Sequence, residues 1–188
     1  MIITLTGFMG CGKSSVGRCL SELLCCPFMD LDAVIEESQG RIIPDIFAAE
    51  GEAAFRQMEV EALSRIIEAQ QLRGNVVVAL GGGAVMTPEC AELVRENTLC
   101  IYLRASVSTL VERLASETES RPLLCQNTSS SMPAEGAKLS DHQLRNRIEV
   151  LLAQRAATSE NTASIIIDTD GKSIDQICTE ILKLSPTN

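Results

Sequence analysis

The sequence predicts a three-layer α/β/α fold in which helices cover both faces of a five-stranded parallel sheet. Five short apolar runs show no alternation with polar residues, which is typical of strands covered on both faces: 2–6, 27–31, 75–80, 98–103 and 164–168. Longer stretches with helical periodicity follow these runs, at 13–24, 31–39, 52–71, 88–96, 106–118, 140–157 and 173–184. Strands that alternate with helices favour a parallel sheet with right-handed crossovers.

Length and composition favour one domain over residues 1–188. A chain of 188 residues with 45% hydrophobic residues can bury a normal core, and only 3% aromatic residues make that core mainly aliphatic. The net charge of −9 argues against a general surface for nucleic acid or anionic membranes. We therefore expect no nucleic acid as a partner, and since no run of 18 apolar residues occurs, we expect no membrane either. The expected partners are small molecules, and a chain of this size is expected to act as a monomer.

The eight cysteines are best explained as reduced thiols in a cytoplasmic protein. They include no C-x-x-C pair, and a single histidine, His142, offers little for a zinc site. The first residues form a short apolar run without a basic segment before it, so we expect no secretory signal.

Two local patterns mark a helix start and a long loop. Thr87 followed by Pro88 predicts a capping residue and a proline at the first helical position. The Ser-rich stretch 125–141 is poor in large apolar residues, and loops of this length are usually lids or binding loops. We expect a mobile lid over about 117–141.

The stretch "LTGFMGCGKSSVGR", residues 5–18, contains the phosphate-loop pattern G-x-x-x-x-G-K-[ST]. Its glycines Gly7, Gly10 and Gly12 allow the tight backbone that turns N–H groups onto phosphate oxygens. Lys13 would reach the β- and γ-phosphates, and the Ser14 hydroxyl would be a ligand for Mg²⁺. The loop indicates nucleoside triphosphate binding but does not identify the acceptor.

The length of the chain and the absence of a guanine-binding motif narrow the class of nucleotide-binding protein to which it could belong. GTPases would carry a guanine-reading N-K-x-D late in the chain, which is absent here, and motor ATPases are larger. "FMDLD", 28–32, places Asp30 and Asp32 at the end of a predicted strand, where open α/β sheets bind ligands. One carboxylate could hold the water shell of Mg²⁺ and the other could accept a proton, although Asp32 could instead cap a helix.

Two further segments could contact an acceptor. Arg56 lies on a helix that opens at Gly51-Glu52, and alone it could equally be a solvated charge. "LGGGAV", 80–85, puts three glycines directly after a predicted strand, which favours close approach of the backbone to a ligand.

Together these motifs resemble those of shikimate kinases. "GFMGCGKSS", "FMDLDAVIEESQGRIIPDIFAAEGEAAFRQME", "LGGGAV", "RPLL" and "QRA" occur in the family's order, most clearly over residues 1–125 and more weakly to 184. The resemblance implies a nucleoside-monophosphate-kinase-like fold and transfer of the γ-phosphoryl of ATP to the 3-hydroxyl of shikimate, on the route to aromatic amino acids.

The resemblance also assigns roles to residues. Catalysis would involve Lys13, Asp32 and, from the lid, Arg121. Mg²⁺ would be held by Ser14 and, through water, by Asp30. Nucleotide would be bound by Gly10, Cys11, Gly12, Lys13, Ser14, Ser15, Arg121 and Lys172. Shikimate would be bound by Asp32, Arg56, Gly81, Gly82, Gly83 and Arg155, the two arginines meeting its carboxylate.

The chain departs from the family pattern after Arg155. It reads "RAATSEN", so Ala157 and Ser159 stand where the family has Pro and Tyr, and the packing that supports Arg155 could differ. Arg121 and Arg155 are also further apart than is usual in the family. Cys11 stands at the phosphate loop, either as a small packed residue or as a reactive thiol. Two alternatives stay open: a kinase of another polyol acid such as gluconate, and a nucleotide-binding module without turnover.

Overall fold

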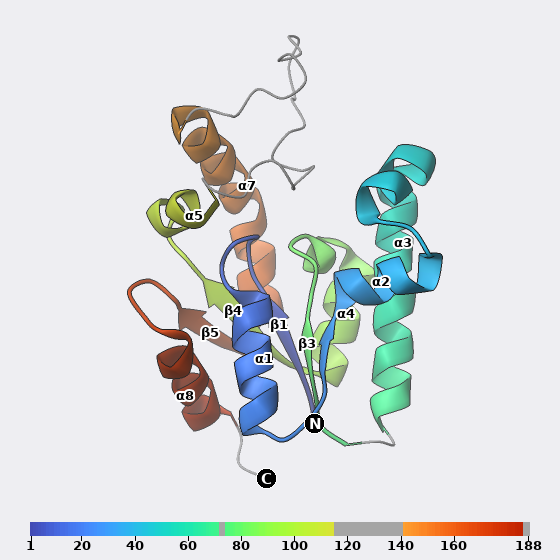
Figure 1. Ribbon diagram of the computed structural model, residues 1–188, viewed down its shortest axis with the longest axis horizontal. Coiled ribbons are helices and arrows are strands. Elements are labelled where there is room, and N and C mark those ends of the chain that lie inside the picture. Colours follow the sequence, from blue (N-terminus) through green and yellow to red (C-terminus); the bar gives the residue numbers. More distant parts are fainter. Residues whose placement is uncertain (72–73, 115–140, 186–188) are drawn as a thin grey trace.

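The structure is a computed structural model that describes residues 1–71, 74–114 and 141–185 (Figure 1). Its centre is a five-stranded sheet in the order β2-β3-β1-β4-β5. The strands are β1 (Ile2–Thr6), β2 (Phe28–Asp30), β3 (Val76–Ala79), β4 (Leu99–Arg104) and β5 (Ile165–Asp168). All four pairings between neighbouring strands are parallel. The predicted α/β fold with five parallel strands is therefore confirmed.

Helices cover the sheet on both faces (Figure 1). The helices are α1 (Lys13–Leu23), α2 (Leu31–Gln39), α3 (Ile43–Gln71), the 3₁₀ turn η1 (Ala84–Met86), α4 (Pro88–Asn97), α5 (Val107–Leu114), α7 (Asp141–Thr162) and α8 (Ile174–Leu184). One buried cluster joins β1 and β4 to α1, α5, α7 and α8 through residues such as Leu5, Leu20 and Ile148. The other joins the sheet to α2, α3 and α4 through residues such as Val78 and Leu63. Both clusters are mainly aliphatic, as the composition predicts.

The carboxyl ends of β1, β2 and β3 lead into the loops that carry the predicted site. β1 runs into the phosphate loop, β2 ends at Asp30 and β3 ends before the triple glycine. Because β1 pairs with β3 and β3 pairs with β2, these three strand ends lie at one edge of the sheet. The order of the strands thus brings together motifs that are far apart in the sequence.

Several boundaries differ from the sequence-based prediction. Helix α3 begins at Ile43 rather than at 52, because a first helical segment precedes Gly51 and the two segments meet there at non-helical angles (φ 81°, ψ 176°). Helix α7 continues to Thr162 rather than to 157, since no proline interrupts the stretch after Arg155. Pro88 occupies the start of α4 as expected, but the Thr87 side chain makes no capping hydrogen bond.

The predicted lid over 117–141, including Arg121, lies almost wholly outside the described residues. In the described part of the chain, no helix has the length and apolar character needed to cross a membrane.

Candidate active site

The phosphate loop has the backbone that its glycines were expected to permit. Gly7, Gly10 and Gly12 all have positive φ angles, of 149°, 79° and 100°. A Cβ at Gly7 would lie 2.6 Å from the carbonyl oxygen of Leu103, so this position has no room for a side chain. Lys13 Nζ donates to the carbonyl oxygens of Gly7 (2.9 Å) and Phe8 (3.1 Å). The ammonium group is thus held over the loop into which phosphates would bind.

Asp30 connects the phosphate loop to the next strand. Its Oδ2 accepts a hydrogen bond from Ser14 Oγ at 2.9 Å, and its Oδ1 accepts one from the backbone N–H of Asp32 at 3.2 Å. Asp30, and not Asp32, is therefore the N-cap of α2. This leaves the Asp32 carboxylate free to face the site.

The Asp32 carboxyl is largely shielded from solvent. Burial raises the pKa of its carboxyl above the ordinary value, and the negative charge of the nearby Asp30 raises it further. The positive charge of Lys13 lowers this pKa, but not enough to cancel the rise. A raised pKa makes the carboxylate a better proton acceptor. Both aspartates were predicted site residues, and the structure brings both to one cavity.

Arg56 is anchored by glutamates on its own helix. Arg56 Nη1 donates to Glu59 Oε2 at 2.6 Å, and Nη2 donates to Glu52 Oε1 at 2.9 Å. The Glu59 side chain is fully buried, whereas that of Glu52 is 62% exposed. Burial disfavours the charged guanidinium, but the attraction and hydrogen bonds of the two glutamates outweigh it and raise the pKa of Arg56. Arg56 is therefore a fixed cation and not a solvated surface charge.

Glu59 is a site residue that the sequence analysis missed. Burial raises the pKa of its carboxyl, against the lowering effect of Arg56. Its second oxygen, Oε1, is buried with no hydrogen-bond partner in the part of the chain described here. The spacing of three residues from Arg56 on one helix was the available signal, because residues i and i+3 share a helix face.

The triple glycine makes room for these side chains. A Cβ at Gly81 would lie 2.6 Å from Glu59 Oε1 and 2.7 Å from Asp32 Oδ1, and one at Gly83 would lie 2.9 Å from Arg56 Nη2. Gly82 is less crowded, with Met9 N the nearest atom at 3.5 Å. None of the three has a positive φ, so an unusual turn is not the reason for them. Because glycine has no Cβ, the side chains of Asp32, Arg56 and Glu59 can pack directly against this loop.

Arg155 reaches the same loop from α7. Its Nη1 donates to the carbonyl oxygen of Gly82 at 3.3 Å, and its guanidinium carbon lies 6.0 Å from the centre of the Phe8 ring. Burial lowers the pKa of Arg155, and the positive charge of Arg56 lowers it further. Two neighbouring cations that repel one another form a natural site for an anion. Helix α7 runs without a break through the altered segment after Arg155, and Ser159 is buried in it.

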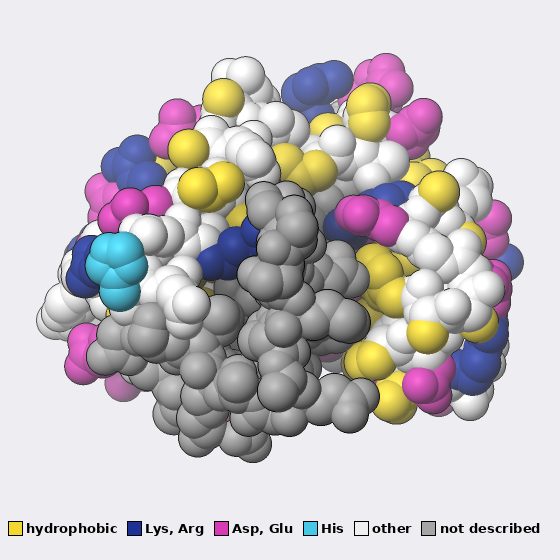
Figure 2. Space-filling view, turned by 90° about the horizontal axis from the view of Figure 1, so that it is seen from above, with side chains coloured by type: hydrophobic (Ala, Val, Ile, Leu, Met, Phe, Trp, Pro, Cys, Tyr) yellow, Lys and Arg dark blue, Asp and Glu magenta, His cyan; other side chains and the backbone are white. Residues whose placement is uncertain are grey.

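A cavity of about 520 Å³ connects the phosphate loop, the two aspartates, Arg56 and the triple glycine, while Arg155 lies outside its lining. Its polar lining comprises Lys13, Ser14, Asp30, Asp32, Glu36, Arg56, Glu59 and the backbone of Gly81, Gly82 and Gly83. Ile43, Pro44, Phe47 and Phe55 form an apolar wall, and the Phe47 and Phe55 rings lie 4.8 Å apart. Figure 2 looks onto this end of the molecule, where hydrophobic side chains gather over α2 and α3 beside acidic and basic ones. The cavity suits a small polar molecule with one apolar face.

The remaining predicted residues lie outside this lining. Ser15 is exposed in the first turn of α1, and Cys11 is buried in the core. Lys172 lies between β5 and α8, where its Nζ pairs with Glu180 Oε2 at 2.5 Å. Arg113, which sequence reasoning did not single out, donates from α5 to the carbonyl oxygens of Gly10 and Cys11, both at 3.3 Å. Within the described residues, no cluster of His, Cys, Asp and Glu could hold a metal by itself.

Comparison with known proteins identifies the family. The sequence profile of shikimate kinase matches residues 9–185. The chain belongs to the shikimate kinase family. It is 41% identical to the shikimate kinase of Chlorobium chlorochromatii over 97% of this chain and 89% of the relative, and 37% identical to that of Salinibacter ruber over 98% and 84%.

Solved structures agree with this assignment. Shikimate kinase from Acinetobacter baumannii in complex with shikimate matches with a TM-score of 0.82 and 31% identity, over 97% of this chain and 91% of that one. The enzyme from Bacteroides thetaiotaomicron also matches with a TM-score of 0.82, at 29% identity over 98% and 97%. A gluconokinase from Sinorhizobium meliloti shares the fold, with a TM-score of 0.50 and 20% identity over 96% of this chain and 89% of that one. As a member of the shikimate kinase family, the chain is a small-molecule kinase that uses ATP.

Proposed function

We propose that this chain transfers the γ-phosphoryl group of ATP to the 3-hydroxyl of shikimate, which yields shikimate 3-phosphate and ADP. One observation carries the proposal: the phosphate loop opens onto a cavity that holds a carboxylate, Asp32, and a fixed guanidinium, Arg56. The relative from Acinetobacter baumannii, which was solved with shikimate, supports this acceptor.

At the nucleotide end, the loop would bind the triphosphate through Gly10, Cys11, Gly12, Lys13, Ser14 and Ser15. The backbone N–H groups at the start of α1 favour an anion. Lys13 would exchange its carbonyl partners, Gly7 and Phe8, for phosphate oxygens. Lys172 would contact the nucleotide, and Arg121 would neutralise charge on the transferring group.

We also propose Mg²⁺ as the accompanying ion. Ser14 and Asp30 supply hard oxygen atoms, which Mg²⁺ prefers, and their side chains lie side by side on the wall of the cavity. The bound ion would neutralise phosphate charge. Asp30 would act through water, because it also caps α2.

At the acceptor end, Asp32 would orient the shikimate hydroxyl and accept its proton. Its raised pKa suits this role. Arg56 and Arg155 would bind the shikimate carboxylate, which relieves the repulsion between their charges. The backbone around Gly82 would approach the ring, and Phe47 and Phe55 would cover its apolar face.

We further infer that the chain works as a monomer in a reducing compartment such as the cytoplasm. The seven described cysteines are free thiols, four of them buried. Sedimentation of the purified chain at assay concentration tests the monomer, and a catalytically competent dimer that never dissociates would contradict it.

The deciding experiment measures ADP release from Mg·ATP with shikimate, gluconate or no acceptor. We expect release that requires shikimate. Release that is faster with gluconate would contradict the acceptor. Nucleotide binding without any release would favour a nucleotide-binding module without turnover.

Two variants extend this test. Lys13→Met should abolish release while the fold is kept, and wild-type rates would contradict the role of the loop. Asp32→Asn should lower kcat by roughly a hundredfold or more. Asp45→Asn is its matched control, because the Asp45 side chain is exposed, does not line the cavity and should leave kcat unchanged when replaced.

A further inference from the structure

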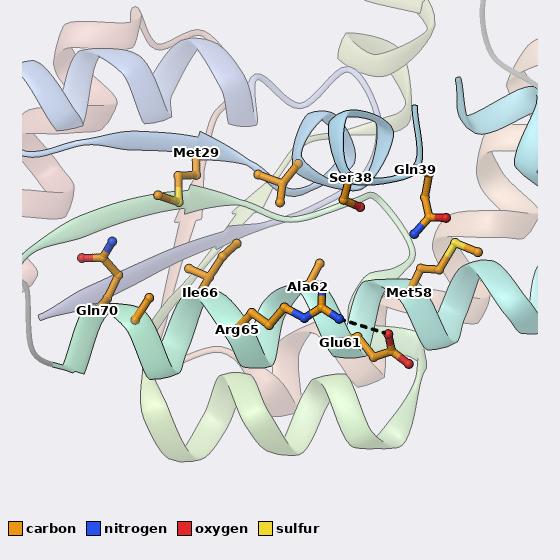
Figure 3. A pocket seen from close by; sticks show the side chains of 11 residues that line it. Met29, Ser38, Gln39, Met58, Glu61, Ala62, Arg65, Ile66 and Gln70 are labelled. Atoms are coloured by element: carbon orange, nitrogen blue, oxygen red, sulfur yellow. Dashed lines mark ion pairs between the residues drawn. The ribbon is translucent and has the colours of Figure 1, made fainter. Parts of the chain in front are cut away.

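Two features of the structure lie outside the site described above. One is a small cavity between α2 and α3 with largely apolar walls (Figure 3). The charged residues that line it, Arg65 and Glu61, already pair with each other, so the lining does not specify an occupant. The other is a pair of cysteines, Cys19 in α1 and Cys178 in α8. The reaction proposed above uses neither thiol.

The two cysteines lie where α1 packs against α8 (Figure 1). Cys178 Sγ donates to the carbonyl oxygen of Val16 at 3.6 Å, and Cys19 Sγ donates to Asp175 Oδ1 at 3.8 Å. Each of these contacts crosses from one helix to the other. Because helical side chains lean toward the N-terminus, the Cys19 side chain lies over the turn of Val16, which the Cys178 thiol contacts. The two thiols are therefore neighbours.

The two thiols differ in their access to solvent. Cys19 is partly exposed, whereas Cys178 is fully buried. Burial raises the pKa of the Cys178 thiol, a hydrogen bond with Cys19 and the charge of Cys19 add to the rise, and the pKa reaches about 12. Cys178 therefore stays protonated at neutral pH and is shielded from molecules in solution. Cys19 is the member of the pair that a small oxidant reaches first.

The nearby Cys25 and Cys26 do not offer a competing bond of ordinary geometry. They are adjacent in the sequence, and within the described residues every peptide bond is trans. Their Cα atoms are thus about 3.8 Å apart, which is closer than the Cα atoms of an ordinary disulfide. Cys19 and Cys178 come from different helices and are free of this restriction.

We propose that Cys19 and Cys178 form a reversible disulfide that lowers the affinity of the chain for nucleotide. The Cys19 thiolate first attacks a small disulfide such as oxidised glutathione, which gives a mixed disulfide on Cys19 and releases one glutathione thiol. The Cys178 sulfur then attacks the Cys19 sulfur, gives up its proton and releases the second glutathione, which takes up that proton. The two cysteines are oxidised while one external disulfide is reduced to two thiols. Because the fold holds the two sulfur atoms together, the second step can proceed although little of Cys178 is ionised.

The bond acts on nucleotide because both helices begin beside segments that bind it in the proposed function. Helix α1 starts at Lys13, directly after the phosphate loop, and α8 starts two residues after Lys172. A disulfide holds its sulfur atoms about 2.05 Å apart, which is closer than two unbonded thiols can lie. Its formation therefore shifts α1 against α8 and with it the start of the phosphate loop. This effect rests on the proposed function, whereas the bond itself does not.

The bond is tested by treating the purified chain with oxidised glutathione and mapping its peptides without reduction. We expect a peptide that links Cys19 to Cys178. Cys178→Ala should stop at the mixed disulfide on Cys19, and Cys19→Ser should leave Cys178 as a thiol. Cys25→Ser removes a more exposed thiol near the end of α1 and is the matched control, which should still form the bond.

The effect on nucleotide is measured as the Kd of Mg·ADP by calorimetry, before and after oxidation. We expect this Kd to rise by roughly fivefold or more in the wild type and to return to its first value with dithiothreitol. Cys19→Ser, treated in the same way, should keep its affinity.

Two kinds of result overturn the proposal. A peptide map in which Cys19 stays a mixed disulfide in the wild type, or in which either cysteine links to a different partner, would remove the bond. An equal Kd of the oxidised and reduced chains would remove the effect on nucleotide. A chain that does not turn over shikimate would contradict the proposed function but leave the peptide map standing.

Discussion

At the residue scale, the least predictable part of the site is Glu59. A buried glutamate has no obvious place in a cavity for an anionic substrate, since its charge opposes that of the ligand. Its contact with Arg56 gives the reason: it fixes the guanidinium and offsets part of its charge. Glu59→Gln keeps the size but removes the charge, so we expect the shikimate KM to rise by roughly tenfold, with kcat changed much less.

Glu52 provides the matched control for this prediction. It contacts the same arginine from an exposed position, and exposed pairs contribute little. Steady-state kinetics of Glu52→Gln should therefore give a KM close to that of the wild type. Equal effects of the two variants would mean that burial is not what makes Glu59 important.

The raised pKa of Glu59 also predicts how the free energy of unfolding depends on pH. The folded-state pKa of Glu59 is raised, so between the ordinary glutamate pKa of 4.5 and the raised value the folded protein binds more protons than the unfolded chain. The free energy of unfolding then falls as pH rises through this window. Denaturant titrations at several pH values should show this slope in the wild type and a smaller one in Glu59→Gln. An identical slope in both proteins would contradict the assignment.

At the element scale, the strands and most helices could be predicted, because periodicity reports which faces are buried. The first segment of α3 could not, because Gly51 reads as a boundary when it is a kink between two helices. The triple glycine was recognised as a place of close approach, but the partners, Asp32, Arg56 and Glu59, come from elements distant in the sequence. Contacts of that kind depend on strand order, which local patterns do not specify.

The kink itself is testable. Gly51 has φ 81° and ψ 176°, a region that is almost restricted to glycine, and Gly40 has φ 61° and ψ 24°, which other residues tolerate better. A Cβ at either position would meet nothing within 4 Å, so backbone strain alone separates them. Gly51→Ala should cost about 1–3 kcal/mol and Gly40→Ala about 1 kcal/mol. Thermal unfolding measures both, and a smaller loss for Gly51→Ala would contradict the argument.

At the scale of the whole molecule, the two buried clusters support different parts of the active site. The cluster on one face supports α1, α5, α7 and α8 around the phosphate loop, and the other supports α2, α3 and α4 around the acceptor cavity. Helix α7 belongs to the first cluster but also carries Arg155 to the Gly82 loop on the acceptor side. The hydrogen bond between Ser14 and Asp30 joins the two sides at the strand ends. The two substrates should therefore stabilise different parts of the protein.

Hydrogen exchange can test this division. Shikimate alone should slow amide exchange in α2 and α3, and Mg·ADP alone should slow it in the loop 7–14 and at the start of α1. Either ligand at a hundred times its Kd adds up to about 2.7 kcal/mol of stability. Arg155→Met should weaken protection by shikimate and leave protection by Mg·ADP intact, because Arg155 contacts the Gly82 loop from the acceptor side. Protection of α1 by shikimate as strong as that of α2 would mean that the molecule responds as one unit.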